Sequence, residues 1–132
     1  MELIVYTDGG SRGNPWISGI WVYITDSEWQ EIEKRYKNLG IKTNNEAEYL
    51  GAFYGIRRAI ELWATEIKLY MDSRLVIKQL SGEWKIKKHE LKKIHADIIT
   101  LVTDFSGKVS YNWVRREDNT NADRLANLAM DE

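Results

Sequence analysis

The sequence of 132 residues contains no cysteine and only one proline. Without cysteine the protein can form no disulfide, no thiolate metal site and no cysteine nucleophile. No apolar run approaches the roughly 20 residues of a membrane span, and residues 1–4 lack the basic and apolar regions of a signal peptide. We therefore expect a cytoplasmic protein that does not associate with a membrane.

An excess of one charge is also absent, because 19 Lys and Arg residues nearly balance 20 Asp and Glu residues, for a formal net charge of -1. Any phosphate-binding surface therefore has to be local. Hydrophobic residues make up 43% of the sequence, and six Trp and seven Tyr can fill a sizeable core. The sequence has no repeat, low-complexity stretch or Pro-rich linker, so residues 1–132 are predicted to form a single domain.

Hydrophobic patterning predicts an α/β fold. Strands are expected at residues 2–8, 19–26, 28–36, 66–71 and 108–114, and helices at residues 44–63, 74–81, 88–105 and 121–131. A glycine-rich turn follows Asp8, and a polar turn at Asp26 and Ser27 joins the next two strands. The first three strands should therefore form an antiparallel meander.

Asp8 and Asp72 stand at the ends of the first and fourth predicted strands. Because a helix separates these strands in the sequence, they should lie parallel if they share a sheet. A right-handed crossover then places their C-terminal ends side by side. The two Asp side chains are therefore expected to be neighbours.

The first predicted helix carries Gly51 and Gly55 at interior positions, where each costs about 1 kcal/mol relative to alanine. With Ala52 and Ala59 they form a stripe of small residues, which would let the helix approach the sheet closely. Glu48 lies on the same stripe, one turn earlier. This carboxylate is therefore expected near the strand ends that carry the two Asp residues.

A fourth acidic residue, Asp123, falls in the first turn of the last predicted helix, where the helix dipole favours a carboxylate. Acidic side chains that converge repel one another unless cations lie between them, and ligand sets made of oxygen suit Mg²⁺ or Mn²⁺. Two such ions about 3.5 to 4 Å apart can activate a water and stabilise the leaving oxygen in phosphodiester cleavage. Taken singly, an Asp at a strand end or before a glycine turn is more often a turn former than a catalytic residue, and Glu48 more often a solvated helix charge. Only their joint placement favours catalysis.

Four segments resemble, in order and spacing, the motifs of type 1 ribonuclease H: residues 7–15 (TDGGSRGNP), 43–48 (TNNEAE), 70–73 (YMDS) and 121–126 (NADRLA). The resemblance implies a ribonuclease H-like fold, a five-stranded mixed sheet of three antiparallel strands followed by two parallel ones, with flanking helices. It also implies hydrolysis of the RNA strand of RNA/DNA hybrids to 5'-phosphate and 3'-hydroxyl ends. Two Mg²⁺ ions, replaceable by Mn²⁺, would be held by Asp8, Glu48, Asp72 and Asp123.

The resemblance also implies which residues contact the hybrid. Backbone amides and Asn side chains can sense 2'-hydroxyls in the wide, shallow minor groove of an A-type duplex. The residues implied are Gly9, Ser11, Gly13, Asn14, Asn44, Asn45 and Glu48 for the RNA strand, and Thr43 for a phosphate of the DNA strand. The alternative is that Gly13 and Asn14 only form a turn and that Asn44 only caps the helix.

One stretch of the sequence is strongly basic, with five lysines in the nine positions from residue 85 to 93. Lys85, Lys87 and Lys88 are candidates for phosphate contacts, and Trp84 for a flat surface against a sugar or base. The alternative is a solvated helix face with Trp84 in the core. Family members with a basic handle have a longer insertion here, so we expect weak or strongly salt-dependent affinity.

The loop before the last helix departs from a common family pattern. Many members have a histidine there, whereas residues 115–120 read RREDNT. This resembles an Arg-Glu-x-Asn version, with Arg116, Glu117 and Asn119 at the matching positions. His95 is expected on the apolar side of its helix, and neither it nor His89 is assigned a catalytic role.

A binding module that holds the hybrid without cutting it is the main alternative from another functional class. Such a module would be expected to lack a metal ligand, and all four acidic residues are present in the sequence. An integrase or transposase would be longer and would place its third acid differently. We therefore expect a monomeric enzyme that acts on RNA/DNA hybrids.

Overall fold

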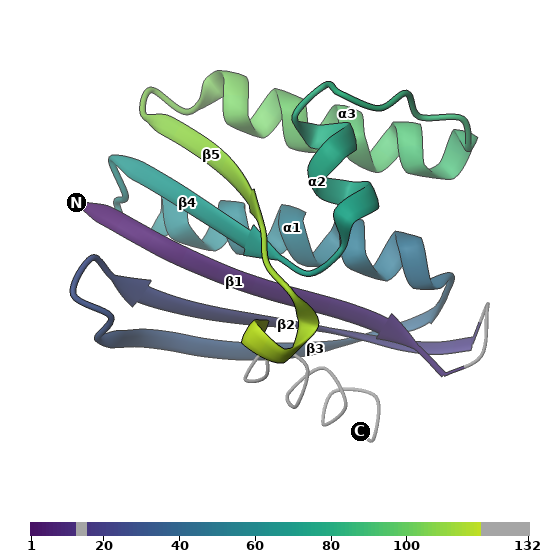
Figure 1. The fold of residues 1–132 in the computed structure, drawn as a ribbon, viewed down its shortest axis with the longest axis horizontal. Coiled ribbons are helices and arrows are strands. Elements are labelled where there is room, and N and C mark those ends of the chain that lie inside the picture. The colour runs from purple at the N-terminus through teal and green to yellow at the C-terminus, as the bar shows by residue number, and fades with distance from the viewer. Residues whose placement is uncertain (13–15, 120–132) are drawn as a thin grey trace.

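The computed structural model describes residues 1–12 and 16–119 (Figure 1). The sheet consists of β1 (Glu2–Ser11), β2 (Trp16–Asp26), β3 (Glu31–Lys42), β4 (Glu66–Met71) and β5 (Lys108–Trp113). The helices are α1 (Asn44–Glu61), α2 (Arg74–Leu80), α3 (His89–Asp104) and the short 3₁₀ helix η1 (Arg116–Asn119). The strand order is β3-β2-β1-β4-β5.

Pairing in the sheet is antiparallel between β1, β2 and β3 and parallel between β1, β4 and β5. This confirms the predicted fold class, including the parallel arrangement of the first and fourth strands. In Figure 1, α1 lies behind the sheet, with α3 along its upper edge. Within the described residues, no helix has the length and apolarity needed to cross a membrane.

Alternation along the strands places one set of side chains in the core between the sheet and the helices. Leu3 and Val5 of β1 and Leu69 of β4 are fully buried there. Tyr49 and Ile56 cover them from α1 and belong to the same cluster of buried residues. The predicted stripe of α3 is also confirmed, because its buried and partly buried members, Leu91, Ile94, Ile98, Leu101 and Phe105, pack in this core.

The stripe of small residues on α1 faces the sheet, as predicted. A Cβ on Gly55 would lie 2.6 Å from Cγ2 of Thr7 and 2.9 Å from Cγ1 of Val5, well inside contact distance. Gly51 also faces β1, but its Cβ would lie at an ordinary contact distance, 3.4 Å from the backbone oxygen of Asp8. The helix therefore rests almost directly on β1, and this brings its first turns to the level of Asp8.

The predicted turn immediately after Asp8 is wrong, because Gly9 and Ser11 continue β1 opposite Ile20 and Ser18 of β2. The glycine has a different purpose at this position. A Cβ on Gly9 would lie 2.4 Å from the backbone oxygen of Ala47. Gly9 is therefore required for close contact with α1 rather than for a turn.

The end of α1 also differs from the prediction, which carried the buried stripe to Trp63. The helix ends at Glu61, and Trp63 is 85% exposed with a φ of 67°. Backbone amides of Trp63 and Ala64 donate to the carbonyls of Ile60 and Ala59, at 3.0 and 3.1 Å, which is the Schellman pattern of helix termination. Trp63 occupies the left-handed position that glycine usually takes.

The strand predicted at residues 28–36 begins later, at Glu31, and continues to Lys42. The carboxylate of Asp26 accepts hydrogen bonds from the amides of Glu28 and Gln30, at 2.9 and 3.0 Å, and so extends the turn to residue 30. Trp29 lies in that turn with a φ of 66°. The helix predicted at residues 121–131 lies outside the described residues.

Candidate active site

Asp8 and Asp72 lie where β1 and β4 separate. The last parallel pair between these strands is Tyr6 with Tyr70, so each Asp is two residues beyond it. Asp8 remains inside β1, opposite Trp21 of β2, rather than at the strand end as predicted. The fork between two separating parallel strands is where an open α/β sheet offers a site for ligands.

Glu48 approaches the same fork from the first turns of α1. The helix is capped by Thr43, whose hydroxyl accepts from the amide of Glu46 at 3.2 Å while the Glu46 carboxylate accepts from the amide of Thr43 at 3.0 Å. This capping box fixes the start of the helix and hence the height of Glu48 above the sheet. Carboxylate oxygens of Asp8, Glu48 and Asp72 all lie within 4.8 Å of one another.

The three carboxylates differ in their surroundings. Asp8 is 6% exposed, and its Oδ1 accepts a 2.9 Å hydrogen bond from the amide of Gly9. Burial and the adjacent charge of Asp72 raise the pKa of Glu48 to about 7, although a hydrogen bond from Ser73 and the charge of Arg116 act in the opposite direction. Near neutral pH Glu48 is therefore only partly ionised in the absence of a cation, and a cation bound between the carboxylates would favour its charged form.

The donor set fits a hard divalent cation. The cluster offers three carboxylates and, within the described residues, no sulfur or imidazole ligand. Oxygen donors of this kind select Mg²⁺ or Mn²⁺ over softer metals. Asp123, predicted as the fourth ligand, lies outside the described residues.

Of the polar residues predicted to contact the hybrid, those that the structure describes lie on β1 and at the start of α1. The amide of Ser11 donates a 3.1 Å hydrogen bond to Oδ1 of Asn44, which joins the end of β1 to the first residue of α1. Thr43, not Asn44, caps the helix, so the alternative role for Asn44 is wrong. Asn44 is exposed and Asn45 partly exposed. Gly13 and Asn14 lie outside the described residues.

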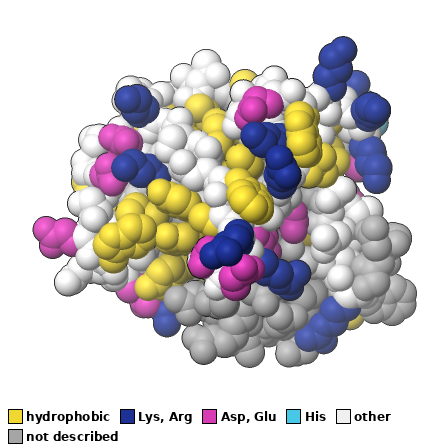
Figure 2. Space-filling view, viewed as in Figure 1, with side chains coloured by type: hydrophobic (Ala, Val, Ile, Leu, Met, Phe, Trp, Pro, Cys, Tyr) yellow, Lys and Arg dark blue, Asp and Glu magenta, His cyan; other side chains and the backbone are white. Residues whose placement is uncertain are grey.

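The basic segment lies in the connection between α2 and α3. Trp84 is 44% exposed, so the alternative that places it in the core is wrong. Lys85, Lys87 and Lys88 are exposed, and Lys and Arg side chains gather at the upper right of the molecule, over the connection from α2 to α3 (Figure 2). Gln79 anchors this segment, because its Nε2 donates to the carbonyl of Lys85 at 3.0 Å.

Arg74 and Trp113 are two further residues at the site that sequence reasoning missed. The guanidinium carbon of Arg74 lies 5.9 Å from the ring centre of Trp84 and 6.0 Å from that of Trp113. Nε1 of Trp113 donates to the carbonyl of Asp72 at 3.2 Å. The position of Arg74, two residues after Asp72, was the available signal, but its contacts with the two tryptophans come from distant segments.

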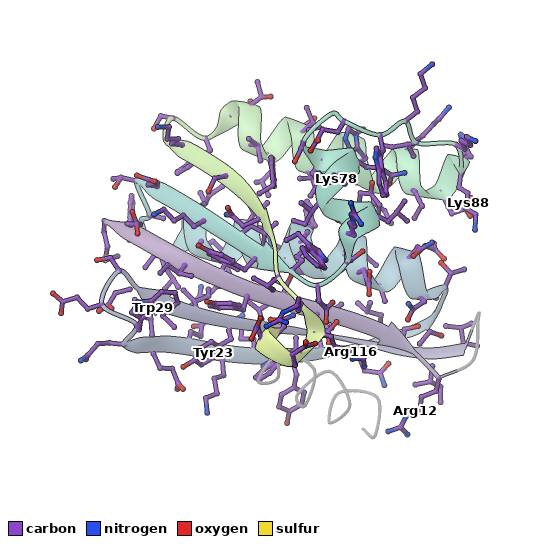
Figure 3. The ribbon with its side chains drawn as sticks, in the orientation of Figure 1. Arg12, Tyr23, Trp29, Lys78, Lys88 and Arg116 are labelled. Atoms are coloured by element: carbon purple, nitrogen blue, oxygen red, sulfur yellow. The ribbon has the colours of Figure 1, made fainter. Side chains whose placement is uncertain are left out.

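The predicted loop residues form η1, close to the carboxylates. Asn119 is 2% exposed, and its Nδ2 donates a 3.1 Å hydrogen bond to the carbonyl of Thr7. Arg116 acts electrostatically on Glu48, whereas Glu117 is exposed. In Figure 3, Arg12 and Lys88 lie toward the end of the molecule where β1 terminates, Trp29 lies toward the opposite end, and Arg116 lies between them.

The predicted histidine position agrees with the structure. His95 is partly buried, with its ring 6.4 Å from that of Tyr49 at an interplanar angle of 72°. It does not belong to the group of described residues that could hold a metal.

Comparisons with known proteins agree with this geometry. A family model described as reverse transcriptase-like matches residues 8–129. A ribonuclease H of Ruthia magnifica subsp. Calyptogena magnifica is 32% identical over 143 residues, which cover 98% of this chain and 96% of the relative. The chain belongs to the ribonuclease H family.

Other members of the ribonuclease H family match at higher identity or in solved structures. The bifunctional protein Rv2228c of Mycobacterium tuberculosis is 42% identical over 132 residues, 99% of this chain and 36% of the relative. The chain therefore spans about a third of the length of the first curated relatives it matches. The structure of LC11-RNase H1 in complex with an RNA/DNA hybrid matches with a TM-score of 0.92 and 33% identity, covering 98% of this chain and 96% of that one.

Proposed function

We propose that this chain hydrolyses the RNA strand of RNA/DNA hybrids as an endonuclease that uses two metal ions. The observation that carries the proposal is the cluster of Asp8, Glu48 and Asp72 at the fork of β1 and β4. Membership of the ribonuclease H family supports the reaction. The similarity to a family member solved with an RNA/DNA hybrid supports the substrate.

Asp8, Glu48 and Asp72 would hold two Mg²⁺ ions, with Asp123 as a fourth ligand and Mn²⁺ as a substitute. Ions held there would lower the pKa of a water and stabilise the leaving 3'-oxygen; attack of that water on phosphorus with cleavage of the bond to the 3'-oxygen would give 5'-phosphate and 3'-hydroxyl ends. The protein's own contribution is to hold the ligands in place. The amide of Gly9 orients Asp8, while Ser73 and Arg116 favour the charged form of Glu48.

We propose that the hybrid crosses the carboxylates between two protein surfaces. On one side, polar groups contact the RNA strand and a phosphate of the DNA strand; they comprise Gly9, Ser11, Gly13, Asn14, Thr43, Asn44 and Asn45. On the other side lie Trp84 and three exposed lysines, Lys85, Lys87 and Lys88. The charges of these lysines can neutralise phosphates. Because only RNA carries 2'-hydroxyls, contacts on the first side would distinguish the two strands.

The test is cleavage of an end-labelled RNA/DNA hybrid in Mg²⁺, beside single-stranded RNA and RNA/RNA duplex. We expect cleavage of the RNA strand of the hybrid, loss of activity in EDTA, and 3'-hydroxyl ends. Asp72→Asn should lower the rate at least 10³-fold, whereas Asp97→Asn, on an exposed position of α3, should not change it. Activity that persists in EDTA, or products with 2',3'-cyclic phosphates, would overturn the two-metal proposal.

Binding of the hybrid without cleavage would instead favour the alternative of a non-cleaving module.

We also propose that residues 1–132 act as a single monomeric domain. Sedimentation of the free protein and of its complex with a short hybrid measures this directly. A dimer mass for the free protein would contradict it.

A further inference from the structure

A groove of about 440 Å³ lies between α1 and the strands β2 and β3, and its lining includes none of the three clustered carboxylates. Five of the residues that line it are basic, namely Lys34, Arg35, Lys37, Arg57 and Arg58, and one, Glu61, is acidic. In a chain with a net charge of -1, this is a marked local excess of positive charge. None of these residues belongs to the site proposed above.

The groove exists because α1 does not cover the edge strand. Ile20 and Val22 of β2 point toward α1 and are nearly fully buried. Their cross-strand partners in β3, Lys37 and Arg35, lie on the same face of the sheet. Since α1 packs mainly against β1 and β2, these two β3 side chains lie beside the helix rather than beneath it and line the groove.

Part of the positive charge is neutralised inside the groove wall. Glu33 lies 2.7 Å from Arg58 and 2.9 Å from Arg35, and Arg58 also lies 3.5 Å from Glu61. The hydrogen bond from Arg58 lowers the pKa of Glu33, so this acid stays ionised. These ion pairs fix the wall between α1 and β3. Lys34 is paired as well, since its Nζ lies 3.3 Å from the carboxylate of Glu31. Two of the five basic residues of the groove, Lys37 and Arg57, are left to account for.

Lys37 and Arg57 meet at Tyr54 instead of at an acid. Nζ of Lys37 lies 4.9 Å from the centre of the Tyr54 ring, and Cζ of Arg57 lies 4.8 Å from it. Neither basic group forms an ion pair with any residue that the structure describes. The ring thus holds two cations close together, one from β3 and one from α1, with no anion supplied by the described chain.

The groove is within reach of a nucleic acid strand that continues past Thr43, the proposed contact with a phosphate of the DNA strand. Lys37 precedes Thr43 by six residues of nearly extended chain, or roughly 20 Å. Arg57 follows Glu48 by nine helical residues, or about 14 Å. At ~3.4 Å per nucleotide, a strand that leaves the proposed Thr43 contact would need only about six nucleotides to reach the groove.

We propose that this groove binds the phosphate backbone of a single-stranded nucleic acid segment that extends beyond the hybrid. The site size suits one strand rather than a duplex, since its volume is that of a small-ligand pocket. Lys37 and Arg57 contact phosphates, and the Tyr54 ring, which both basic groups approach, keeps the two charges close together. The inference rests on the proposed function in one respect, that the bound strand is a continuation of the hybrid. Binding of a single strand to the groove can itself be measured without cleavage.

The experiment is fluorescence anisotropy of a labelled 12-nucleotide single-stranded DNA in EDTA, across a series of salt concentrations. Lys37→Gln and Arg57→Gln are compared with Lys108→Gln, which removes one exposed lysine at the start of β5. Each groove variant should weaken binding about five- to tenfold in low salt. Each should also reduce the slope of log K against log salt by about 0.7, the value for one phosphate contact on a single strand. Thermal denaturation of each variant checks that it is folded.

The proposal is overturned if both groove variants bind the oligonucleotide with the wild-type affinity and salt slope, or if Lys108→Gln has the same effect. It is also overturned if poly-glutamate of equal charge displaces the DNA equally well, because the groove would then serve an acidic protein segment. A wild-type protein that binds the oligonucleotide through the groove but cleaves no hybrid would refute the proposed function alone. Where the hybrid is cleaved, a single-stranded DNA overhang should lower KM for wild type more than for Arg57→Gln.

Discussion

The side-chain amide of Asn119 donates a 3.1 Å hydrogen bond to the backbone carbonyl of Thr7, 112 residues earlier in the chain. Thr7 is one residue past the last pair between β1 and β4, Tyr6 with Tyr70. Asn119 thus contacts the backbone of β1 just where pairing with β4 stops. The residue that follows is Asp8, so this hydrogen bond fixes the segment that presents the most buried of the three carboxylates.

Asn119→Ala is therefore expected to destabilise the protein by about 1 to 3 kcal/mol, because it leaves a buried carbonyl without its donor. The measurement is urea denaturation. Asp118→Ala is the matched control, since Asp118 is exposed and forms only a surface ion pair with Arg115 at 3.4 Å, worth about 0 to 1 kcal/mol. Equal midpoints for the two variants would show that the hydrogen bond does not hold β1.

Glu48→Gln is expected to stabilise the metal-free protein at pH 8. The pKa of Glu48 is raised to about 7 in the folded state, so ionisation opposes folding. Below the ordinary pKa of 4.5 the group is protonated in both states and the penalty is absent. The penalty then grows as pH rises to about 7 and reaches at most about 3.5 kcal/mol, at about 1.4 kcal/mol per pKa unit.

Denaturation of both proteins in EDTA at pH 4 and pH 8 measures this difference. Wild type and Glu48→Gln should be similar at pH 4 and should diverge at pH 8, with the variant more stable. Added Mg²⁺ should then stabilise wild type more than the variant by mass action. A variant that is less stable than wild type at pH 8 in EDTA would mean that the Ser73 and Arg116 interactions outweigh burial.

Two alanine substitutions on α1 should have opposite effects. Gly51→Ala should stabilise the protein by up to about 1 kcal/mol, because helix propensity improves and the new Cβ finds its nearest neighbour at an ordinary 3.4 Å. Gly55→Ala gains the same propensity but places a Cβ 2.6 Å from Thr7 and 2.9 Å from Val5. Both neighbours are stiff β-branched side chains, so overpacking of about 1 to 3 kcal/mol should dominate.

Thermal unfolding of the two single variants is the measurement, and they serve as controls for each other. If Gly55→Ala is as stable as Gly51→Ala, α1 does not rest on β1 as closely as described. That result would also weaken the explanation of how Glu48 reaches the fork.

Arg74→Ala is expected to raise KM for the hybrid about tenfold, the equivalent of ~1.4 kcal/mol, with little change in kcat. The guanidinium carbon lies 5.9 Å from the ring centre of Trp84 and 6.0 Å from that of Trp113, which donates to the carbonyl of Asp72, so we expect Arg74 to contact a phosphate of the hybrid. Arg74→Lys should recover only part of the loss, since lysine cannot stack as a plane. Lys78→Ala, also on α2 but paired with Glu83, is the control. A lower kcat at unchanged KM would place Arg74 in the chemical step instead.

The order and type of the elements could be predicted from the sequence because they depend on neighbours a few residues apart. Alternation gave the strands, a three- and four-residue repeat gave α1 and α3, and the crossover rule made β1 and β4 parallel. The glycines at 51 and 55 indicated close approach of α1 to the sheet. These local patterns were enough to predict from the sequence that the carboxylates of Asp8, Glu48 and Asp72 lie close together.

Only the tertiary structure decided the features that depend on contacts between distant segments. The hydrophobic repeat of α1 continues to Trp63, but the helix ends at Glu61 and Trp63 is exposed to solvent. The repeat does not show where the helix ends. Three such features join separate elements: the hydrogen bond from Asn119 to Thr7, the approach of Arg74 to two tryptophans, and the basic groove beside β3. Side-chain periodicity specifies which face of an element is buried, but the partner that covers it is set by packing of the whole chain, which a single sequence does not display.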